Sequence, residues 1–262
     1  MKKIHALKTA VLVAVALLVA AAASAQEVRV VTSGGFTEAY KQLAPQFERA
    51  TGIHVISAFG ASLGATPDAI PNRLKRGEPI DVIILAGPGL EALIKEGRVD
   101  PRNQFDLVRS LIGMAVRTGA PKPDISTLDA FKRTLLQAKS IGYSDSASGV
   151  YLSTVLFPKL GVAEQVAGKS RKVRGPPSGE PVAAVVARGE AEIGFQQVSE
   201  LIRVPGVTFV GAIPAELQPG FSFAGALASN ARQPDAGSTL LRFLASPAAA
   251  PAILKAGLTP PQ

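Results

Sequence analysis

Short apolar, β-branched runs alternate with amphipathic helical patterns along this chain, and this alternation constrains the fold more than any other feature. Up to residue 96, strands are expected at 28–32, 53–58 and 81–85, with helices at 36–50, 68–76 and 88–96. The same order resumes with strands at 111–117, 140–143, 171–174 and 192–196 between helices at 127–137, 149–159 and 180–188. Strands that alternate with helices form parallel sheets covered by those helices. The pattern therefore predicts two α/β units in one chain.

An internal echo supports the division into two units. Residues 75–82, KRGEPIDV, and residues 187–194, ARGEAEIG, both read as a helix end, a glycine, an acid and a strand. Gly77 and Gly189 stand where a helix commonly closes with a left-handed residue. Coincidence is the alternative, because such a cap is a good ending for any helix.

The C-terminal part of the chain is expected to return to the first unit. It offers a strand at 207–211, an extended stretch at 220–228, and helices at 234–244 and 247–256 that carry no polar constellation. The predicted organisation is a first lobe of residues 26–114 plus 215–262 and a second lobe of residues 115–214. A ligand cleft is expected between the two lobes.

Three loops rich in serine and glycine join a predicted strand to a predicted helix. They contain Ser33 with Gly35, Ser62 between Gly60 and Gly64, and Ser146 with Ser148. Glycine lets the backbone approach a ligand, serine supplies a hydroxyl, and the following helix presents free N–H groups. Each loop alone could be a simple helix cap. All three lie at carboxyl ends of strands, where open α/β sheets bind ligands, so the pattern predicts a shared anion-binding cleft.

Residues 1–25 have the features of a cleaved export signal. Lys2, Lys3 and Lys8 precede an apolar run, and Ala23-Ser24-Ala25 fits a small-residue cleavage site. The sequence has no cysteine, which excludes disulfides, thiolate metal sites and a lipid-modified N-terminal cysteine. We therefore expect a free periplasmic protein, cleaved near Ala25.

The charge balance favours a small anionic ligand. Loss of the signal removes three lysines and no acid, so the formal net charge falls from +8 to +5. The only dense basic group, at 169–174, lacks the interleaved aromatic residues that stack on single-stranded nucleic acid. No nucleic-acid partner is expected. The sequence shows no metal-ligand cluster, and His54 is the only histidine of the mature chain, so no metal, cofactor or Ser-His-Asp triad is expected.

Segments spread over the whole mature chain carry a family resemblance. They are VRVVTSGGFTEAYKQLAPQFERATGIHV, GEPIDVIIL, YSDSASGVYL and VVARGEAEIGF. With them the chain resembles the periplasmic molybdate-binding family of two-lobed solute-binding proteins. The resemblance implies the type 2 periplasmic binding-protein fold, in which each lobe is a mainly parallel sheet flanked by helices. It also implies a monomer whose lobes close on an anion.

The oxyanion ligands of that family map only partly onto this chain. The family's second serine corresponds to Ser62, whereas its first serine aligns with Gly35, and Ser33 two residues earlier is the substitute. The family's tyrosine falls at Gln197, beside Gln196, so an amide replaces a phenol. These departures turn the expected ligand from molybdate toward an organic carboxylate.

Two arginines are predicted to hold such a carboxylate. Guanidinium groups pair with carboxylates through two parallel hydrogen bonds. Arg73 lies on the helix that follows the Ser62 loop, and Arg117 ends the strand expected to cross between the lobes. For each of them a plain surface charge is the alternative.

The double glutamine and the long segment SLGATPDAIPNRLKRGEP resemble a divergent branch of the family that includes aconitate isomerase. This resemblance implies an isomerase that interconverts trans-aconitate and cis-aconitate, a tricarboxylate, by an allylic proton shift. The alternative is the binding protein of an ABC transporter for a small anion, with a membrane permease as its partner. The fold alone does not separate the two.

An aconitate isomerase needs one base and a cradle rich in cations or N–H groups. Candidates near the predicted cleft are Tyr143, Asp145, Tyr151 and Glu200, and of these Tyr151 and Tyr143 are predicted to relay the proton. His54 lies in a predicted buried strand and is expected to be structural.

Overall fold

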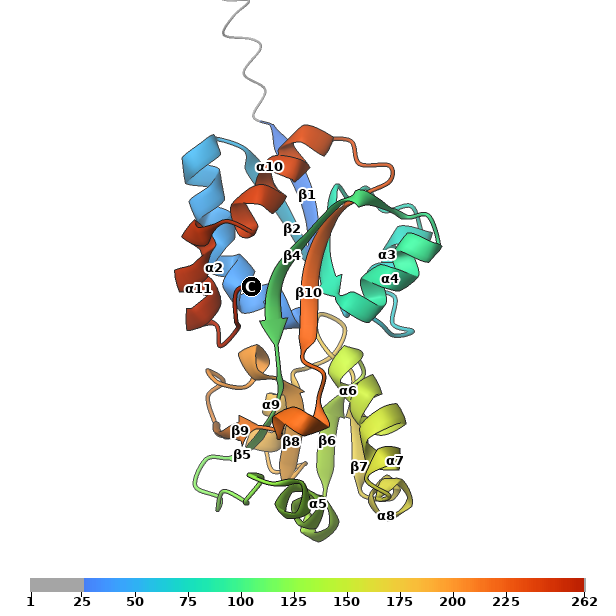
Figure 1. Cartoon of the computed structure of the whole chain (residues 1–262), viewed down its shortest axis with the longest axis vertical. Helices are drawn as coiled ribbons and strands as arrows, with labels where there is room; N and C mark the ends of the chain where they lie inside the picture. The colour runs from blue at the N-terminus through green and yellow to red at the C-terminus, as the bar shows by residue number, and fades with distance from the viewer. Residues whose placement is uncertain (1–25, 262) are drawn as a thin grey trace, which may run out of the picture.

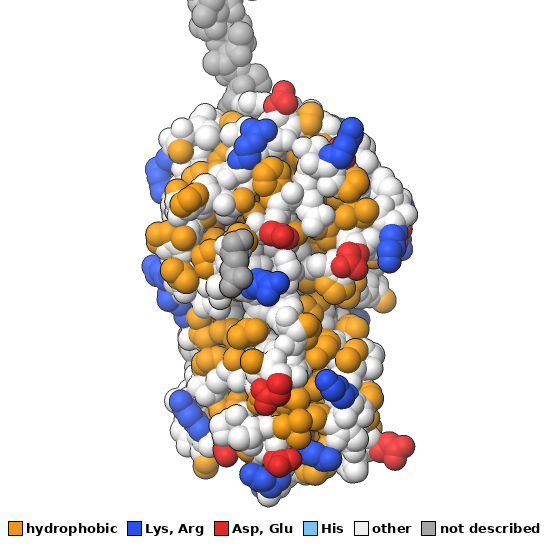
Figure 2. All heavy atoms as spheres, in the orientation of Figure 1, with side chains coloured by type: hydrophobic (Ala, Val, Ile, Leu, Met, Phe, Trp, Pro, Cys, Tyr) orange, Lys and Arg blue, Asp and Glu red, His pale blue; other side chains and the backbone are white. Residues whose placement is uncertain are grey.

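Two five-stranded sheets, each covered by helices, form two lobes stacked along the long axis of the protein, as the ribbon view (Figure 1) and the space-filling view (Figure 2) show. The computed structural model describes residues 26–261, so the expected signal segment lies outside the described residues. The first lobe contains β1 (Glu27–Thr32), α2 (Gly34–Thr51), β2 (His54–Phe59), α3 (Ile70–Lys75), β3 (Val82–Ala86), α4 (Gly87–Lys95), β4 (Val99–Ser110), β10 (Phe221–Ala228), α10 (Pro234–Leu244) and α11 (Ala250–Lys255).

The second lobe is built from one continuous stretch of chain. It contains β5 (Ile112–Arg117), α5 (Leu128–Gln137), β6 (Ile141–Ser144), α6 (Ala147–Tyr151), α7 (Phe157–Lys159), α8 (Ala163–Ala167), β7 (Ser170–Val173), α9 (Val182–Ala187), β8 (Ile193–Gln197), the single turn η2 (Val198–Glu200) and β9 (Val207–Ala212). A π-helical turn, η1 (Leu152–Leu156), joins α6 to α7, so residues 147–159 form one uninterrupted helical segment.

Both sheets have the same arrangement of strands. The first has the order β2-β1-β3-β10-β4, and the second has the order β7-β6-β8-β5-β9. In each sheet three neighbouring strands are parallel, as predicted, whereas β10 and β5 run antiparallel to both of their neighbours. The two-lobed α/β architecture is confirmed. The sheets are mixed because two strands of each sheet, β4 and β10 in the first and β5 and β9 in the second, adjoin the segments in which the chain crosses between the lobes.

The chain crosses between the lobes twice. It leaves β4 at Ser110 and enters β5 at Ile112, and it returns through the turn η3 (Ala215–Leu217) into β10. Sheet membership therefore changes at Leu111, slightly before the 114/115 boundary suggested by the sequence, which falls inside β5. The sequence did not predict β4, because it is an edge strand whose middle, around Arg102, is polar and exposed.

The C-terminal segment adds β10, α10 and α11 to the first lobe. Asp81, which is 2% exposed, fixes this return with its carboxylate. It accepts hydrogen bonds from the backbone N–H of Arg29 (2.9 Å), Arg232 (2.6 Å) and Gln233 (2.9 Å). One buried acid thus ties β1 and β3 to the approach to α10.

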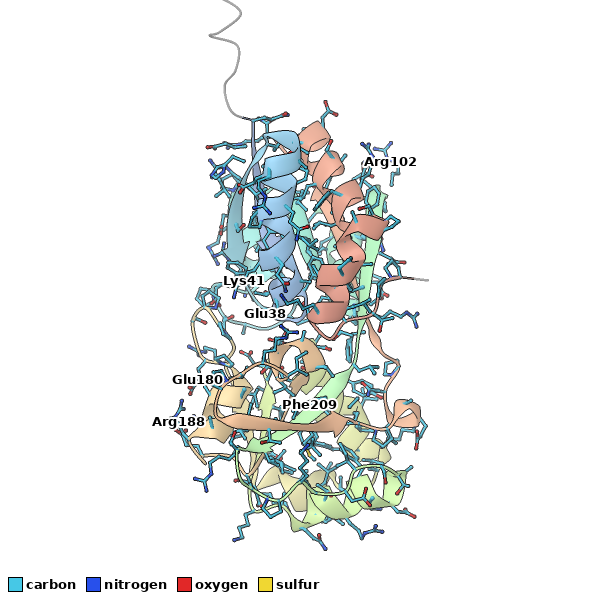
Figure 3. All side chains as sticks on the ribbon, turned by 90° about the vertical axis from the view of Figure 1, so that its left-hand side faces the viewer. Glu38, Lys41, Arg102, Glu180, Arg188 and Phe209 are labelled. Carbon is cyan, nitrogen blue, oxygen red and sulfur yellow. The ribbon has the colours of Figure 1, made fainter. Side chains whose placement is uncertain are left out.

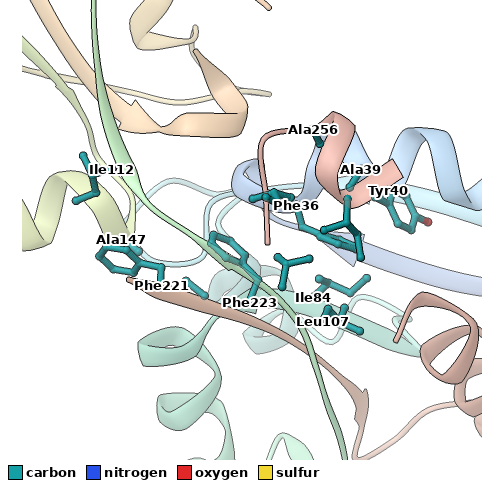
Figure 4. Packing of buried hydrophobic residues seen from close by; sticks show 14 of the residues in the cluster. Phe36, Ala39, Tyr40, Ile84, Leu107, Ile112, Ala147, Phe221, Phe223 and Ala256 are labelled. Carbon is teal, nitrogen blue, oxygen red and sulfur yellow. The ribbon is translucent and has the colours of Figure 1, made fainter. Parts of the chain in front are cut away.

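A continuous apolar core underlies the lobes and their junction. Helix α2 buries Phe36, Tyr40, Leu43 and Phe47 at helical spacing against the first sheet. The same cluster continues through Phe223 of β10 to Ile112 at the start of β5 (Figure 4). Within residues 26–261, no helix is both long and apolar enough to cross a membrane.

Candidate functional site

A cavity of about 480 Å³ lies between the two lobes, and all three Ser/Gly loops line it. The loops contribute Ser33, Gly35, Ser62, Ser146 and Ser148, and the end of β8 contributes Gln196 and Gln197. Parallel strands bring their carboxyl ends to the same edge of a sheet, so loops far apart in the sequence meet here. The aromatic rings of Phe59 and Phe223 supply apolar walls.

On the first lobe, the amino end of α2 offers a ready donor to the cavity. The Ser33 hydroxyl, which is 1% exposed, has no hydrogen-bond partner within the described part of the chain. The first amide groups of a helix also lack intrahelical acceptors. By contrast, the Ser62 hydroxyl accepts the backbone N–H of Ala86 at 3.0 Å, which anchors the loop to the end of β3.

On the second lobe, hydrogen bonds from other residues hold the side-chain amide oxygens of the two glutamines. The Gln197 amide oxygen accepts the Ser110 hydroxyl at 2.7 Å, while its buried Nε2 has no partner among residues 26–261. The Gln196 amide oxygen accepts the backbone N–H of Val182 at 3.1 Å. Unpaired buried donors are costly. Gln197 and Ser33 both line the cavity, and each keeps a buried donor without a partner among residues 26–261.

Five charged side chains line the cavity: Glu38, Lys41, Asp145, Glu200 and Arg203. Lys41 donates to Glu38 at 3.0 Å, and Figure 3 shows both at the end of α2 that faces the second lobe. Arg203 is exposed and forms no ion pair with any other described residue. Two cations at one cavity can hold an anion with more than one carboxylate.

Glu200 is a cavity acid whose surroundings shift its pKa. Burial raises the pKa of Glu200 to about 7, although hydrogen bonds from the Gln196 side chain and the Gln197 backbone oppose the shift, and nearby Glu38 adds to it. The Gln196 amide donates to the Glu200 carboxyl at 2.7 Å. A carboxyl group with a pKa near neutrality can exchange a proton under physiological conditions.

Neither arginine predicted from the sequence lines the cavity. The helix expected at 68–76 begins only at Ile70, so Arg73 falls in its last turn and pairs with Glu78. Arg117 is exposed at the far end of β5, because β5 starts at the lobe junction and runs away from the cavity. The cations at the site are Lys41 and Arg203 instead.

The two tyrosines also lie outside the set of lining residues. The Tyr151 hydroxyl donates to the backbone oxygen of Leu217 at 2.8 Å, and its ring packs edge-on against Phe221. Burial raises the pKa of Tyr151, which disfavours the phenolate that a base would need. The ring of Tyr143 packs against Phe157. Both tyrosines thus support the second lobe and the connection back to β10.

His54 lies away from the cavity, but in a different setting from the buried strand expected. Its side chain is exposed at the start of β2, which is an edge strand, and it pairs with Glu48 at 2.7 Å. In residues 26–261, no group of three or more His, Cys, Asp or Glu side chains could hold a metal ion.

Sequence reasoning missed the two cations of the cavity. Lys41 stands one helical turn after Thr37, which also lines the cavity near the start of α2. Arg203 follows the double glutamine through the turn η2. Both cations thus lie a few residues after a predicted site residue, and this proximity along the chain was the available signal.

Direct hydrogen bonds join the lobes around the cavity. The Asp68 carboxylate of the first lobe accepts the backbone N–H of Ser178 at 2.7 Å and the Ser178 hydroxyl at 3.0 Å. The Ser199 hydroxyl donates to the Gly35 carbonyl at 2.8 Å. The structure therefore has its lobes in contact, with Asp68 acting as a latch.

Asp68→Ala is expected to weaken anion binding roughly tenfold, because the closed form loses two hydrogen bonds to a charged group. Calorimetric titration of the anion measures this loss. Ser178→Ala is the matched variant, and it should have a smaller effect because the backbone N–H of residue 178 still donates. Equal affinity in the wild type and Asp68→Ala would show that the latch does not contribute to closure.

The fold and the site together define a two-lobed binding protein with a cavity at the lobe junction. The family model for bacterial extracellular solute-binding proteins matches residues 28–259, and the chain belongs to this family. Membership places the protein outside the bacterial cytoplasm.

Individual relatives are similar over most of the chain. An aconitate isomerase from Pseudomonas sp. is 49% identical over 231 residues, which cover 88% of this chain and 87% of the relative. Among solved structures, the periplasmic molybdate-binding protein of Azotobacter vinelandii has a TM-score of 0.71 at 20% identity, covering 90% of this chain and 100% of that one. The sulfate-binding protein SubI from Mycobacterium tuberculosis also has a TM-score of 0.71, at 18% identity, covering 90% of this chain and 87% of that one. The two solved structures show the shared fold.

Proposed function

We propose that this protein is an isomerase that interconverts trans-aconitate and cis-aconitate within the cavity between its lobes. The observation that carries the proposal is the 49% identity to an aconitate isomerase across 88% of the chain. The proposed reaction needs no redox cofactor, because an allylic proton shift is neither an oxidation nor a reduction.

The cavity has the chemistry that a tricarboxylate requires. Lys41 and Arg203 supply positive charge, and Ser33 Oγ and Gln197 Nε2 supply donors that lack protein partners within the described residues. The proposed binding set is completed by further lining residues, namely Gly35, Ser62, Ser146, Ser148 and Gln196. Donors already aimed at a cavity stabilise negative charge that develops during a reaction.

The second candidate function is a receptor that delivers a small anion to a membrane ABC permease. It is favoured by the solved neighbours, which are named for molybdate and sulfate binding. It shares with the first function a periplasmic location, a monomeric state and closure of the lobes on an anion. The two functions differ in what happens to the bound ligand: the isomerase converts it, whereas the receptor releases it unchanged.

Incubation of the purified mature protein with trans-aconitate is the decisive experiment. We expect cis-aconitate to accumulate up to the equilibrium ratio, as followed by proton NMR. Parallel calorimetry with trans-aconitate, citrate, molybdate and sulfate ranks the ligands. Tight binding of an inorganic oxyanion without any turnover of trans-aconitate would support the receptor and contradict the isomerase.

Arg203→Ala is expected to raise the KM for trans-aconitate between roughly tenfold and a hundredfold, because a charge-assisted hydrogen bond to a carboxylate is lost. Arg102→Ala is the matched control, since Arg102 is exposed on β4 of the first lobe, far from the second lobe (Figure 3). Steady-state kinetics measure both variants. An unchanged KM in Arg203→Ala would remove Arg203 from the proposed site.

A further inference from the structure

The isomerisation proposed above requires a base, and the structure offers one carboxyl group suited to the task. Glu200 lies in the turn η2, directly after β8, and lines the cavity. The other two acids of the cavity have partners of a different kind, a cation in one case and a loop backbone in the other. Glu38 pairs with Lys41, and the Asp145 carboxylate accepts the backbone N–H of Gly175 at 3.1 Å.

Two contacts fix the orientation of the Glu200 carboxyl. Gln196 donates its amide N–H to Glu200 Oε1, and the opposite end of that amide is held by the backbone of Val182. On its other side the carboxyl faces Gly34, where an added Cβ would lie 2.3 Å from Glu200 Oε1. Glu200 belongs to the second lobe and Gly34 to the first. The carboxyl therefore sits at the lobe junction, against the amino end of α2.

No cation of the described part of the chain neutralises this carboxyl. Among residues 26–261, Glu200 takes part in no ion pair. The charged groups that line the same cavity are Glu38 and Lys41 from α2, Asp145 after β6 and Arg203 after η2. Burial without a counter-ion raises the pKa of Glu200 to about 7, so the group is a base strong enough to act near neutral pH.

We infer that Glu200 is the catalytic residue that removes a proton from the methylene carbon of trans-aconitate and returns it to the former vinyl carbon. The C–H bond of the methylene breaks, and its electron pair forms the new double bond. The electron pair of the old double bond then takes the proton back from the Glu200 carboxyl. Atoms and charge balance without an oxidant, a reductant or a metal ion. In the intermediate, negative charge spreads over the carboxylates held by the cations and free donors of the cavity.

This inference rests on the proposed function, and Glu200→Gln tests it. Glutamine keeps the shape of the side chain and removes the base. We expect kcat for trans-aconitate to fall about a thousandfold, while the calorimetric Kd for trans-aconitate changes by less than about threefold. In the wild type, kcat/KM should rise with pH and level off above about pH 7.

Glu91→Gln is the matched control, because Glu91 is exposed on α4 and outside the cavity. It should keep wild-type kcat and the wild-type pH profile. Turnover by Glu200→Gln within about tenfold of the wild-type rate would overturn the assignment of Glu200 and leave the isomerase standing. A wild-type protein that binds trans-aconitate without converting it would overturn both.

Discussion

Gly149→Ala is expected to lower the free energy of unfolding by about 3 kcal/mol and to abolish anion binding. A Cβ at residue 149 would lie 1.6 Å from the carbonyl oxygen of Ser144 and 2.7 Å from its carbonyl carbon. Both atoms are backbone, so no side-chain rotation relieves the clash. The start of α6 would have to lift away from β6, and Ser146 and Ser148 would leave the cavity with it. Urea unfolding and calorimetric titration measure the two effects.

Gly168→Ala provides the control for this prediction. Gly168 ends α8 with ordinary helical angles (φ −68°), and an added Cβ meets no atom within 4 Å. Its unfolding free energy should stay within about 0.5 kcal/mol of the wild type. If Gly149→Ala behaved like Gly168→Ala, the tight seating of α6 on β6 would not be what positions the third Ser/Gly loop.

The stability of the wild type is expected to fall as pH rises from about 4.5 to about 7, through the ionisation of Glu200. Its pKa is raised from 4.5 to about 7 in the folded protein, mainly by burial. Between these values the folded state keeps a proton that the unfolded state has lost, so raising the pH favours unfolding. The contribution is at most about 3 kcal/mol, because cavity water screens part of it.

Glu200→Gln removes this contribution and should be more stable than the wild type at pH 8, by up to about 3 kcal/mol. The advantage should vanish near pH 4, where Glu200 carries its proton in both states. Urea unfolding of both proteins across this pH range gives the difference between their free energies of unfolding. The contributions of the other ionisable groups are the same in both proteins and cancel. A difference that does not vary with pH would show that Glu200 titrates normally in the folded protein.

Local patterns predicted much of the architecture. Most strand and helix positions were predictable because apolar alternation and helical spacing can be recognised from residues close together in the sequence. The glycines at 77 and 189 do adopt left-handed conformations, with φ of 74° and 77°. The echo between the two units has a structural counterpart in their equal strand arrangements. The edge strand β4 escaped prediction because its exposed residues interrupt the alternation.

The residues that line the cavity were predictable only where the loops themselves carried the signal. Ser33 and Ser62 follow strand ends and Gln197 ends β8, and the ends of parallel strands meet at one edge of a sheet. Arg73 was predicted from its place on the helix after the Ser62 loop, and Arg117 from the end of the strand expected to cross between the lobes. The direction in which α3 and β5 run decides where their side chains lie, and that direction follows from the packing of the whole lobe.

The place of β10 in the first sheet sets an order on the folding of the exported chain. β10 lies between β3 and β4, yet it is the last strand in the sequence. The sheet of the first lobe therefore cannot be completed until residues 221–228 are free to pair with the other strands. The second lobe, whose strands lie between residues 112 and 212, has all of its sheet available earlier. The first lobe depends on pairing between residues far apart in sequence, which forms slowly. The second lobe can thus complete its sheet first, before β10 pairs with β3 and β4 of the first lobe.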